Sequence, residues 1–404
     1  MDNQNIKRTG FKLLEVIIIM IITVSLGVAI GVGIVFHNMK STNMKDCDQY
    51  LVDSNIKEII DTYEFIINKY YAEVDKEELA NGAIKAMLEA LGDPYSTYLD
   101  EEQTGAFDER MMGDYQGIGA EITQDKDGNI LILKTFDNSP AQKAGLQPLD
   151  IILSVDDKSV EGLTTTQVAS LLKGKGGTTV NVKVLRNEEE KTFTVTRDKI
   201  VIISIKQQSF ERNKKKIGYI KIDIFSNNIY EQFREALLAL EKEKIDSLIV
   251  DVRDNSGGFL TRVSEIISMF LPKDKIIYQL KERDGVKEVY SFTDESRSYP
   301  MAVLINQYSA SASEILAVAL KESYGATVVG GTSYGKGTVQ ETKKLATGGM
   351  IKYTIQEWLS PNGNKINEVG VKPDIAIEQN SAYYSEPSIE NDVQLQKALE
   401  VLSQ

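Results

Sequence analysis

A charge-free apolar segment near the N-terminus constrains this chain more than any other feature of its sequence. Val16 to Phe36 contain no charged side chain, and a helix of that length can cross a hydrocarbon core about 30 Å thick. Three basic residues lie within positions 1–12, which favours a cytoplasmic N-terminus. The following His-Asn-Met-Lys offers no signal-peptidase site. We therefore predict a cytoplasmic tail over 1–12 and a single-pass signal anchor over 13–36 in the cell membrane, with everything from about Lys40 onward extracytoplasmic.

Composition excludes several classes of protein. The net charge of −13 argues against a nucleic-acid partner, which would require a basic surface. Cys47 is the single cysteine and His37 the single histidine, so an intrachain disulfide is impossible and a zinc site is disfavoured. We expect no metal and no other cofactor. The 404 residues, 42% of them hydrophobic, can bury two or three cores.

The single histidine also limits the catalytic chemistry. Because His37 ends the apolar segment, a Ser-His-Asp hydrolase would need it to reach a distant site. A lysine can serve as the base instead when burial lowers its pKa enough to leave it neutral. Ser311, in Ser-Ala-Ser-Ala-Ser-Glu-Ile, and Lys336, in Gly-Lys-Gly-Thr-Val-Gln, are the candidates for such a pair.

Residues 50–104 carry a helical pattern. Apolar residues recur three and four positions apart from Ile56 to Tyr70 and again from Leu79 to Leu91, which is typical of one face of a helix. No chemistry is indicated here. We expect packing or dimerisation, so a homo-oligomer is possible.

Residues 105–198 contain four short segments in a characteristic order: Gly117-Ile118-Gly119-Ala120, Ser139-Pro140-Ala141, Ala144-Gly145-Leu146 and Asp150-Ile151-Ile152-Leu153. Taken together in this order, these segments resemble a PDZ domain. In PDZ domains a Gly-x-Gly loop lets backbone N–H groups converge on a peptide's terminal carboxylate, and the peptide adds as a strand beside it. The resemblance implies that Gly117, Ile118 and Gly119 bind substrate, although Leu149 stands where glycine is usual.

Residues 199–378 alternate between strand and helix patterns, which favours a layered α/β fold with a parallel sheet. A turn-rich loop, Arg253 to Gly258, follows one buried strand, and the Ser-Ala-Ser repeat follows another. The expected strands cover 217–222, 247–252 and 302–306, and the expected helices cover 229–242 and 261–270. Residues 379–404 read as a polar linker and a terminal helix.

The serine repeat has two interpretations. Ser309, Ser311 and Ser313 precede an apolar helix, so one of them can be a plain N-cap. Alternatively, a tight turn exposes the Ser311 hydroxyl as a nucleophile, and the Ala312 N–H points at the substrate carbonyl from the positive end of the helix. The Gly257-Gly258 loop can supply a second oxyanion donor because glycine allows close approach.

Lys336 also has alternatives. It can be a solvent-exposed turn lysine, as most lysines are. Gly330 to Lys336 also fits a phosphate-loop pattern, but Gly337 stands where Ser or Thr would hold magnesium. We therefore disfavour a nucleotide site.

Taken in order, these motifs resemble the C-terminal processing, or tail-specific, serine peptidases. The resemblance implies that Ser311 is the nucleophile, that Lys336, 25 residues later, is the general base, and that Gln340 orients Lys336 by a hydrogen bond. Gly257 and Ala312 are the expected oxyanion donors, with Gly258 as the substitute for Gly257. The implied core is similar to the crotonase and Clp-protease folds.

Three positions depart from the family's usual pattern without touching those catalytic residues. Tyr308 stands where relatives commonly have glycine, and Ser256 where many have proline. Tyr95 replaces a frequent histidine in the element Asp-Pro-x-Ser-x-Tyr.

We therefore predict an α/β multidomain protein: a membrane-anchored serine endopeptidase that recognises C-terminal tails of exported proteins through its PDZ domain. The partners expected are proteins or peptides with free C-termini, and the membrane. The alternative is a catalytically silent PDZ scaffold that only binds such tails.

Overall fold

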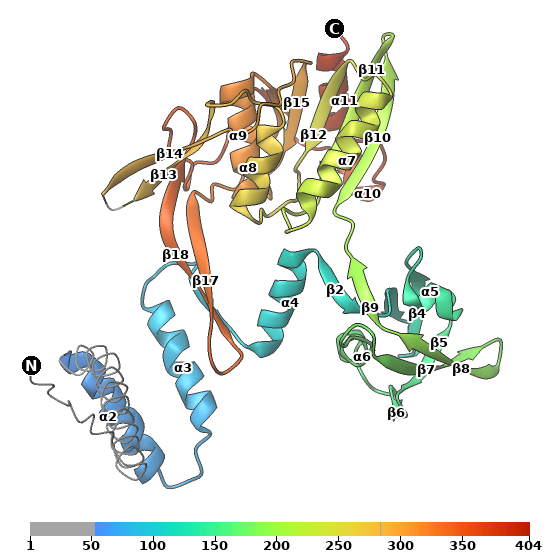
Figure 1. Cartoon of the computed structure of the whole chain (residues 1–404), viewed down its shortest axis with the longest axis vertical. Coiled ribbons are helices and arrows are strands. Elements are labelled where there is room, and N and C mark those ends of the chain that lie inside the picture. Colours follow the sequence, from blue (N-terminus) through green and yellow to red (C-terminus); the bar gives the residue numbers. More distant parts are fainter. Residues whose placement is uncertain (1–52, 283) are drawn as a thin grey trace, which may run out of the picture. The chain divides into compact units, whose positions relative to one another are not determined.

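The computed structural model describes residues 53–282 and 284–404 (Figure 1). The chain divides into two compact units, Met1–Ile84 and Lys85–Gln404. The predicted cytoplasmic tail and signal anchor lie outside the described residues. Within the described ranges, no helix is both long and apolar enough to cross a bilayer.

The helices expected near the N-terminus are present as α2 (Ser54–Lys69) and α3 (Lys76–Glu89). Asp53 caps α2 by accepting the Asn55 N–H at 2.9 Å, which pairs one of the donors left open at a helix start. No residue of α2 is fully buried: Ile66 and Ile67 are half-buried, and Phe65 is 68% exposed.

The region that resembles a PDZ domain forms an antiparallel sheet with β3 at one edge. A valine at every second position of β7 faces its core, and Val180, Val182 and Val184 are fully buried. In order, the sheet strands are β3 (Ala120–Gln124), β4 (Ile130–Thr135), β5 (Ile151–Val155), β7 (Thr179–Arg186) and β8 (Glu189–Thr196). The other elements are β6 (Lys158–Ser159), α5 (Pro140–Ala144) and α6 (Thr165–Leu172), with α4 (Glu101–Met112) before them and the pair β2 (Asp114–Gly117) and β9 (Asp198–Val201).

The expected α/β core follows, built on one six-stranded sheet. Its first strand pair is antiparallel and the remaining pairs are parallel. In spatial order the strands are β10 (Ile205–Arg212), β11 (Lys215–Ile222), β12 (Ser247–Asp251), β15 (Met301–Ile305), β16 (Thr327–Gly330) and β19 (Ile375–Ala376).

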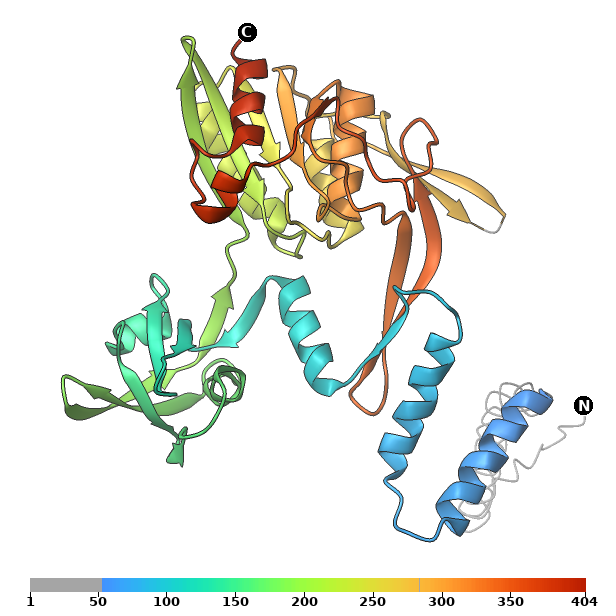
Figure 2. The same ribbon diagram turned by 180° about the vertical axis from the view of Figure 1, so that it is seen from behind.

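Helices cover both faces of this sheet (Figures 1 and 2). One face packs against α7 (Ile229–Lys242), α8 (Leu260–Ser268) and α9 (Ala312–Ala319). The other face packs against α11 (Val393–Leu402) through Leu395 and Leu399. Because side chains alternate along a strand, Ile220 faces the first cluster and Tyr219 the second.

A second sheet carries the strand that follows Lys336. It contains β17 (Thr338–Lys344), β18 (Met350–Leu359), β13 (Ile276–Glu282) and β14 (Gly285–Tyr290), and β1 (Thr97–Leu99) pairs with β18. The β1 pairing places the turn before it, residues 93–96, beside Thr354 of β18. A π-helical turn (Leu320–Tyr324) extends α9, and α10 (Ser381–Ser385) lies in the C-terminal linker.

Leu149 keeps the PDZ turn at an energetic cost. Its φ is 71°, its N–H still donates to Ile132 O at 2.8 Å, and its side chain is 77% exposed. The left-handed conformation costs a non-glycine residue roughly 1–2 kcal/mol. The departure from glycine noted in the sequence therefore strains the turn but does not change its path.

We expect Leu149→Gly to raise the free energy of unfolding of the PDZ region by about 0.5–1 kcal/mol, because the relieved strain exceeds glycine's extra chain entropy. Urea unfolding followed by circular dichroism measures this. Leu133→Gly, at an exposed position inside β4, is the matched control and should destabilise. Equal losses of unfolding free energy in both variants would contradict strain at Leu149.

Candidate active site

Three loops meet at one edge of the parallel sheet. They follow β12, β15 and β16, and because these strands are parallel their carboxyl ends share an edge. Open α/β sheets bind ligands at that edge. The predicted residues Gly257, Ser311 and Lys336 lie one on each of these loops.

Ser311 occupies the sharp turn between β15 and α9. Its φ of 54° and ψ of −115° lie outside the regions that non-glycine residues favour. Such a backbone is strained and aims the side chain outward, as in a nucleophile elbow. Ala312 is the first residue of α9, and no acceptor for its N–H is present within residues 53–282 and 284–404.

The other two serines of the repeat are structural. Ser309 Oγ donates to Val252 O and Ser313 Oγ donates to Asn255 O, both at 2.8 Å. Both residues are fully buried, whereas Ser311 is partly exposed. The structure thus leaves Ser311 as the serine of this repeat that a substrate can reach.

Gly257 touches the elbow directly. A Cβ at this position would lie 2.9 Å from Ser311 Cβ and 3.2 Å from the Ala312 nitrogen, and φ is 106°. Only glycine fits both the space and the dihedral angle. Its N–H, however, donates to Asn255 Oδ1 at 2.8 Å, so the expected oxyanion donor already has an acceptor. The Gly258 N–H has no acceptor in the described ranges.

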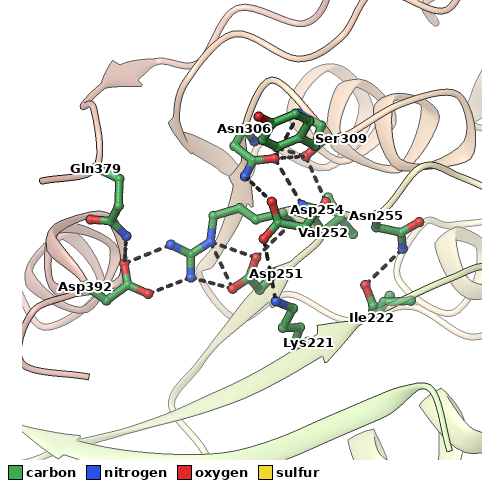
Figure 3. A network of polar contacts seen from close by, with 12 residues as sticks. Lys221, Ile222, Asp251, Val252, Asp254, Asn255, Asn306, Ser309, Gln379 and Asp392 are labelled. Carbon is green, nitrogen blue, oxygen red and sulfur yellow. Dashed lines mark hydrogen bonds and ion pairs between the residues drawn. The ribbon is translucent and has the colours of Figure 1, made fainter. Parts of the chain in front are cut away.

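A buried ionic network fixes the loop that carries Gly257 (Figure 3). Arg253 donates to Asp251 Oδ2 at 2.6 Å and to Asp392 Oδ2 at 2.8 Å. These carboxylates raise the pKa of Arg253 against the effect of its burial. Asp254 Oδ1 accepts the Asn306 side-chain amide at 2.8 Å, which ties this loop to the one before Ser311.

Lys336 is half-buried, and its pKa is lowered in a way that favours the neutral amine. Burial, followed by the nearby charge of Lys352, lowers the pKa of Lys336 to about 8, while Asp93 and Glu314 oppose the change. Its Nζ lies 4.7 Å from the centroid of the Tyr95 ring. Among the described residues, no hydrogen bond joins Nζ to Ser311.

Gln340 lies on β17 but does not bond Lys336. Its Nε2 donates to Thr338 Oγ1 at 2.9 Å and to Thr354 Oγ1 at 3.2 Å. The cause is register, since Gln340 pairs across the strands with Thr354, next to a bulge. Thr354 in turn donates to Asp93 Oδ2 at 2.6 Å. The hydrogen bond that the resemblance implied is therefore replaced by a link to the turn that carries Tyr95.

Two site residues had no assigned role in the sequence. Glu314 accepts backbone N–H groups from both Ser311 and Lys336, and Tyr95 lies under the Lys336 ammonium. Glu314 stands three positions after a serine, the signature of a capping box, which signals a helix start but not contact with a distant loop. Tyr95 lies more than 200 positions before Lys336, and nothing local indicates their contact.

The predicted PDZ loop lies between β2 and β3. Gly119 has a φ of 74°, and a Cβ there would lie 2.5 Å from Ser139 Cβ. Ile118 is buried in the PDZ core, and its carbonyl accepts the Ala141 N–H at 2.8 Å. The N–H groups of Ile118 and Gly119 have no acceptor in the described part of the chain. Beside them, β3 is a sheet edge, which an added strand requires.

Three models of known protein families match separate parts of the chain. Residues 216–377 match the model of peptidase family S41, and residues 117–197 match the PDZ domain. Residues 29–103 match the N-terminal domain of the activating protease CtpB.

Two carboxy-terminal processing proteases agree with these matches. The carboxy-terminal processing protease CtpB of Bacillus subtilis is 40% identical over 352 residues, which are 86% of this chain and 72% of the relative. CtpA of the same organism is 37% identical over 81% of this chain and 70% of its own length. A solved photosystem II D1 C-terminal processing protease is 26% identical with a TM-score of 0.49, covering 88% of this chain and 92% of its own. The chain belongs to peptidase family S41 and is a C-terminal processing serine protease with a PDZ domain.

Proposed function

We propose that this protein is a membrane-anchored endopeptidase that cleaves exported proteins with a Ser311–Lys336 dyad after its PDZ domain binds their C-terminal tails. One observation carries the dyad. The strained turn at Ser311 follows β15, and Lys336, whose pKa is lowered to about 8, follows the neighbouring parallel strand β16. Both residues therefore lie at the same edge of the sheet. A nucleophilic serine needs such a base, and a lysine serves only when neutral.

The proton path follows from these groups. Neutral Lys336 Nζ takes the proton of Ser311 Oγ as Oγ attacks the peptide carbonyl carbon. The C–N bond then breaks, Nζ returns the proton to the leaving amine, and an acyl group remains on Ser311. Water, deprotonated by the same lysine, then attacks the ester carbon; the bond from that carbon to Ser311 Oγ breaks, and Nζ returns the proton to Oγ. Because Nζ lies over the Tyr95 ring, the reactive arrangement requires the lysine side chain to turn toward Ser311.

The oxyanion is stabilised by backbone donors. Ala312 donates from the start of α9, where the helix dipole favours negative charge. The second donor is Gly257 if its N–H leaves Asn255, and otherwise Gly258. In the reactive arrangement Gln340 gives up its hydrogen bond to Thr354 and bonds Lys336 instead.

A silent PDZ scaffold is the second candidate. The free loop N–H groups and the edge strand β3 would serve a scaffold equally well. A lowered lysine pKa beside a strained serine has no use in a scaffold, and perturbed groups of this kind gather at catalytic sites. We therefore favour the peptidase.

The dyad predicts a pH dependence and a loss of activity. Because the base form of Lys336 is the active one, kcat/KM should rise with pH through a value of about 8 and level off above it. Lys336→Arg should reduce kcat by at least about 100-fold, because arginine keeps its proton. Cleavage of fluorescein-labelled casein by the full chain in detergent measures both.

Ser311→Ala should be equally inactive, and Lys365→Arg, at an exposed lysine, should be unaffected. Turnover by Lys336→Arg at the wild-type rate would remove Lys336 from the mechanism.

Carboxylate recognition predicts a difference between free and amidated peptides. Amidating an apolar-ended peptide removes the negative charge and leaves the loop N–H groups poorly paired, which weakens binding by about 1–3 kcal/mol, or roughly 5- to 150-fold. Isothermal titration with both peptides measures this. Equal dissociation constants would contradict carboxylate capture at Gly117, Ile118 and Gly119.

The anchor predicts where the chain is found. The full protein should stay with the membrane until detergent is added, and protease outside intact cells should degrade the catalytic part, because an anchored chain with a cytoplasmic N-terminus exposes the rest outside. N-terminal sequencing of the mature protein is the check. A start downstream of Phe36 would show that the segment is cleaved rather than kept.

A further inference from the structure

We propose that Glu314 is the positioning residue that holds the backbones of Ser311 and Lys336 in place relative to each other. One atom, Oε2, accepts the Ser311 N–H at 2.8 Å and the Lys336 N–H at 2.9 Å. The two residues lie on separate loops, and this carboxylate oxygen joins them where the proposed chemistry occurs. The inference rests on the proposed function.

The second oxygen of Glu314 completes the junction. Oε1 accepts the Ser333 hydroxyl at 2.5 Å and the Gly335 N–H at 2.7 Å. Ser333 Oγ in turn accepts the Val371 N–H at 2.6 Å. Three of the four donors to Glu314 therefore come from the loop of Lys336. A helix cap alone would explain only the bond from Ser311.

The side chain of Glu314 is fully buried, and no lysine or arginine side-chain nitrogen of the described residues lies within 4.0 Å of its carboxylate. Burial raises the pKa of Glu314, while its four hydrogen bonds favour the charged form. All four partners donate, two to each oxygen, so the full set of bonds requires both oxygens to accept, as they do in the ionised carboxylate. A buried charge held by backbone N–H groups is rigid, because releasing any donor leaves polar groups unpaired.

The same charge acts on the lysine. Glu314 and Asp93 favour the ammonium of Lys336, whereas Lys352 and burial favour the neutral amine. The ring of Tyr95 also faces Nζ and favours the cation. Removing the charge of Glu314 should therefore lower the pKa of Lys336 and move the acidic limb of the pH profile to lower pH.

Glutamine at position 314 tests both effects. Its amide keeps one acceptor oxygen but presents an NH₂ group to donors that need an acceptor. We expect Glu314→Gln to lower kcat about 100-fold, because misplacement of reacting groups by about 1 Å has that effect. We expect KM for casein to stay within about 2-fold, since neither residue 314 nor its partners form the PDZ loop.

The experiment uses the full chain in detergent with fluorescein-labelled casein across a pH series. Glu231→Gln is the matched control, because Glu231 is the third residue of α7, as Glu314 is of α9, but is exposed. Its kinetics should equal those of the wild type. If Glu314 had only a structural role, Glu314→Gln would lower the amount of folded protein, but the folded enzyme would keep the pH at which its kcat/KM rises. Wild-type kcat and an unmoved limb in Glu314→Gln would overturn the proposal.

A second variant decides the case if Glu314→Gln fails to fold by circular dichroism. Ser333→Ala keeps the charge and removes one donor, so we expect roughly a 10-fold lower kcat with an unmoved limb, which corresponds to about one lost hydrogen bond. Wild-type turnover by Ser333→Ala would then overturn the proposal. Failure of the proposed function is recognised separately, by cleavage in Ser311→Ala.

Discussion

The parallel pairing of β12, β15 and β16 fixes where the reactive groups can lie. Asp251 pairs with Leu304, and Val303 pairs with Val328, so the three strands end at nearly the same level. Buried serine hydroxyls then fasten one loop to another, as Ser309 does to Val252. The core thereby sets the backbone positions of Ser311 and Lys336.

Arg253, which is buried, and Lys336, which is half-buried, have pKa values shifted in opposite directions for one electrostatic reason. Arg253 is enclosed by two carboxylates and remains charged. Lys336 has no ion pair among the described residues, and burial beside Lys352 moves its pKa toward neutrality. Charge partners offset desolvation in the first case and are too distant in the second. One fold thus holds a permanent structural cation and a titratable base close together.

Local patterns were enough to predict the elements and the loop positions, but not the partners of single atoms. Helix α7 runs over the expected 229–242, and the three loops carry the expected Gly257, Ser311 and Lys336. The bond from Gly257 to Asn255 depends on a side-chain rotamer, and the bond from Gln340 to Thr354 depends on strand register and a bulge. Neither is encoded in the spacing of a motif. The contact of Tyr95 with Lys336 requires β1 to pair with β18, which periodicity does not reveal.

The backbone at Ser311 has an evolutionary consequence. A serine at a φ of 54° holds roughly 1–3 kcal/mol of strain, a sizeable share of the 5–15 kcal/mol that typically separates folded from unfolded domains. Glycine would relieve most of it. In a lineage that no longer needs hydrolysis, selection for stability alone would favour glycine at this position, and drift would follow that direction. A serine retained at this position therefore indicates selection for activity, because glycine would give the more stable fold.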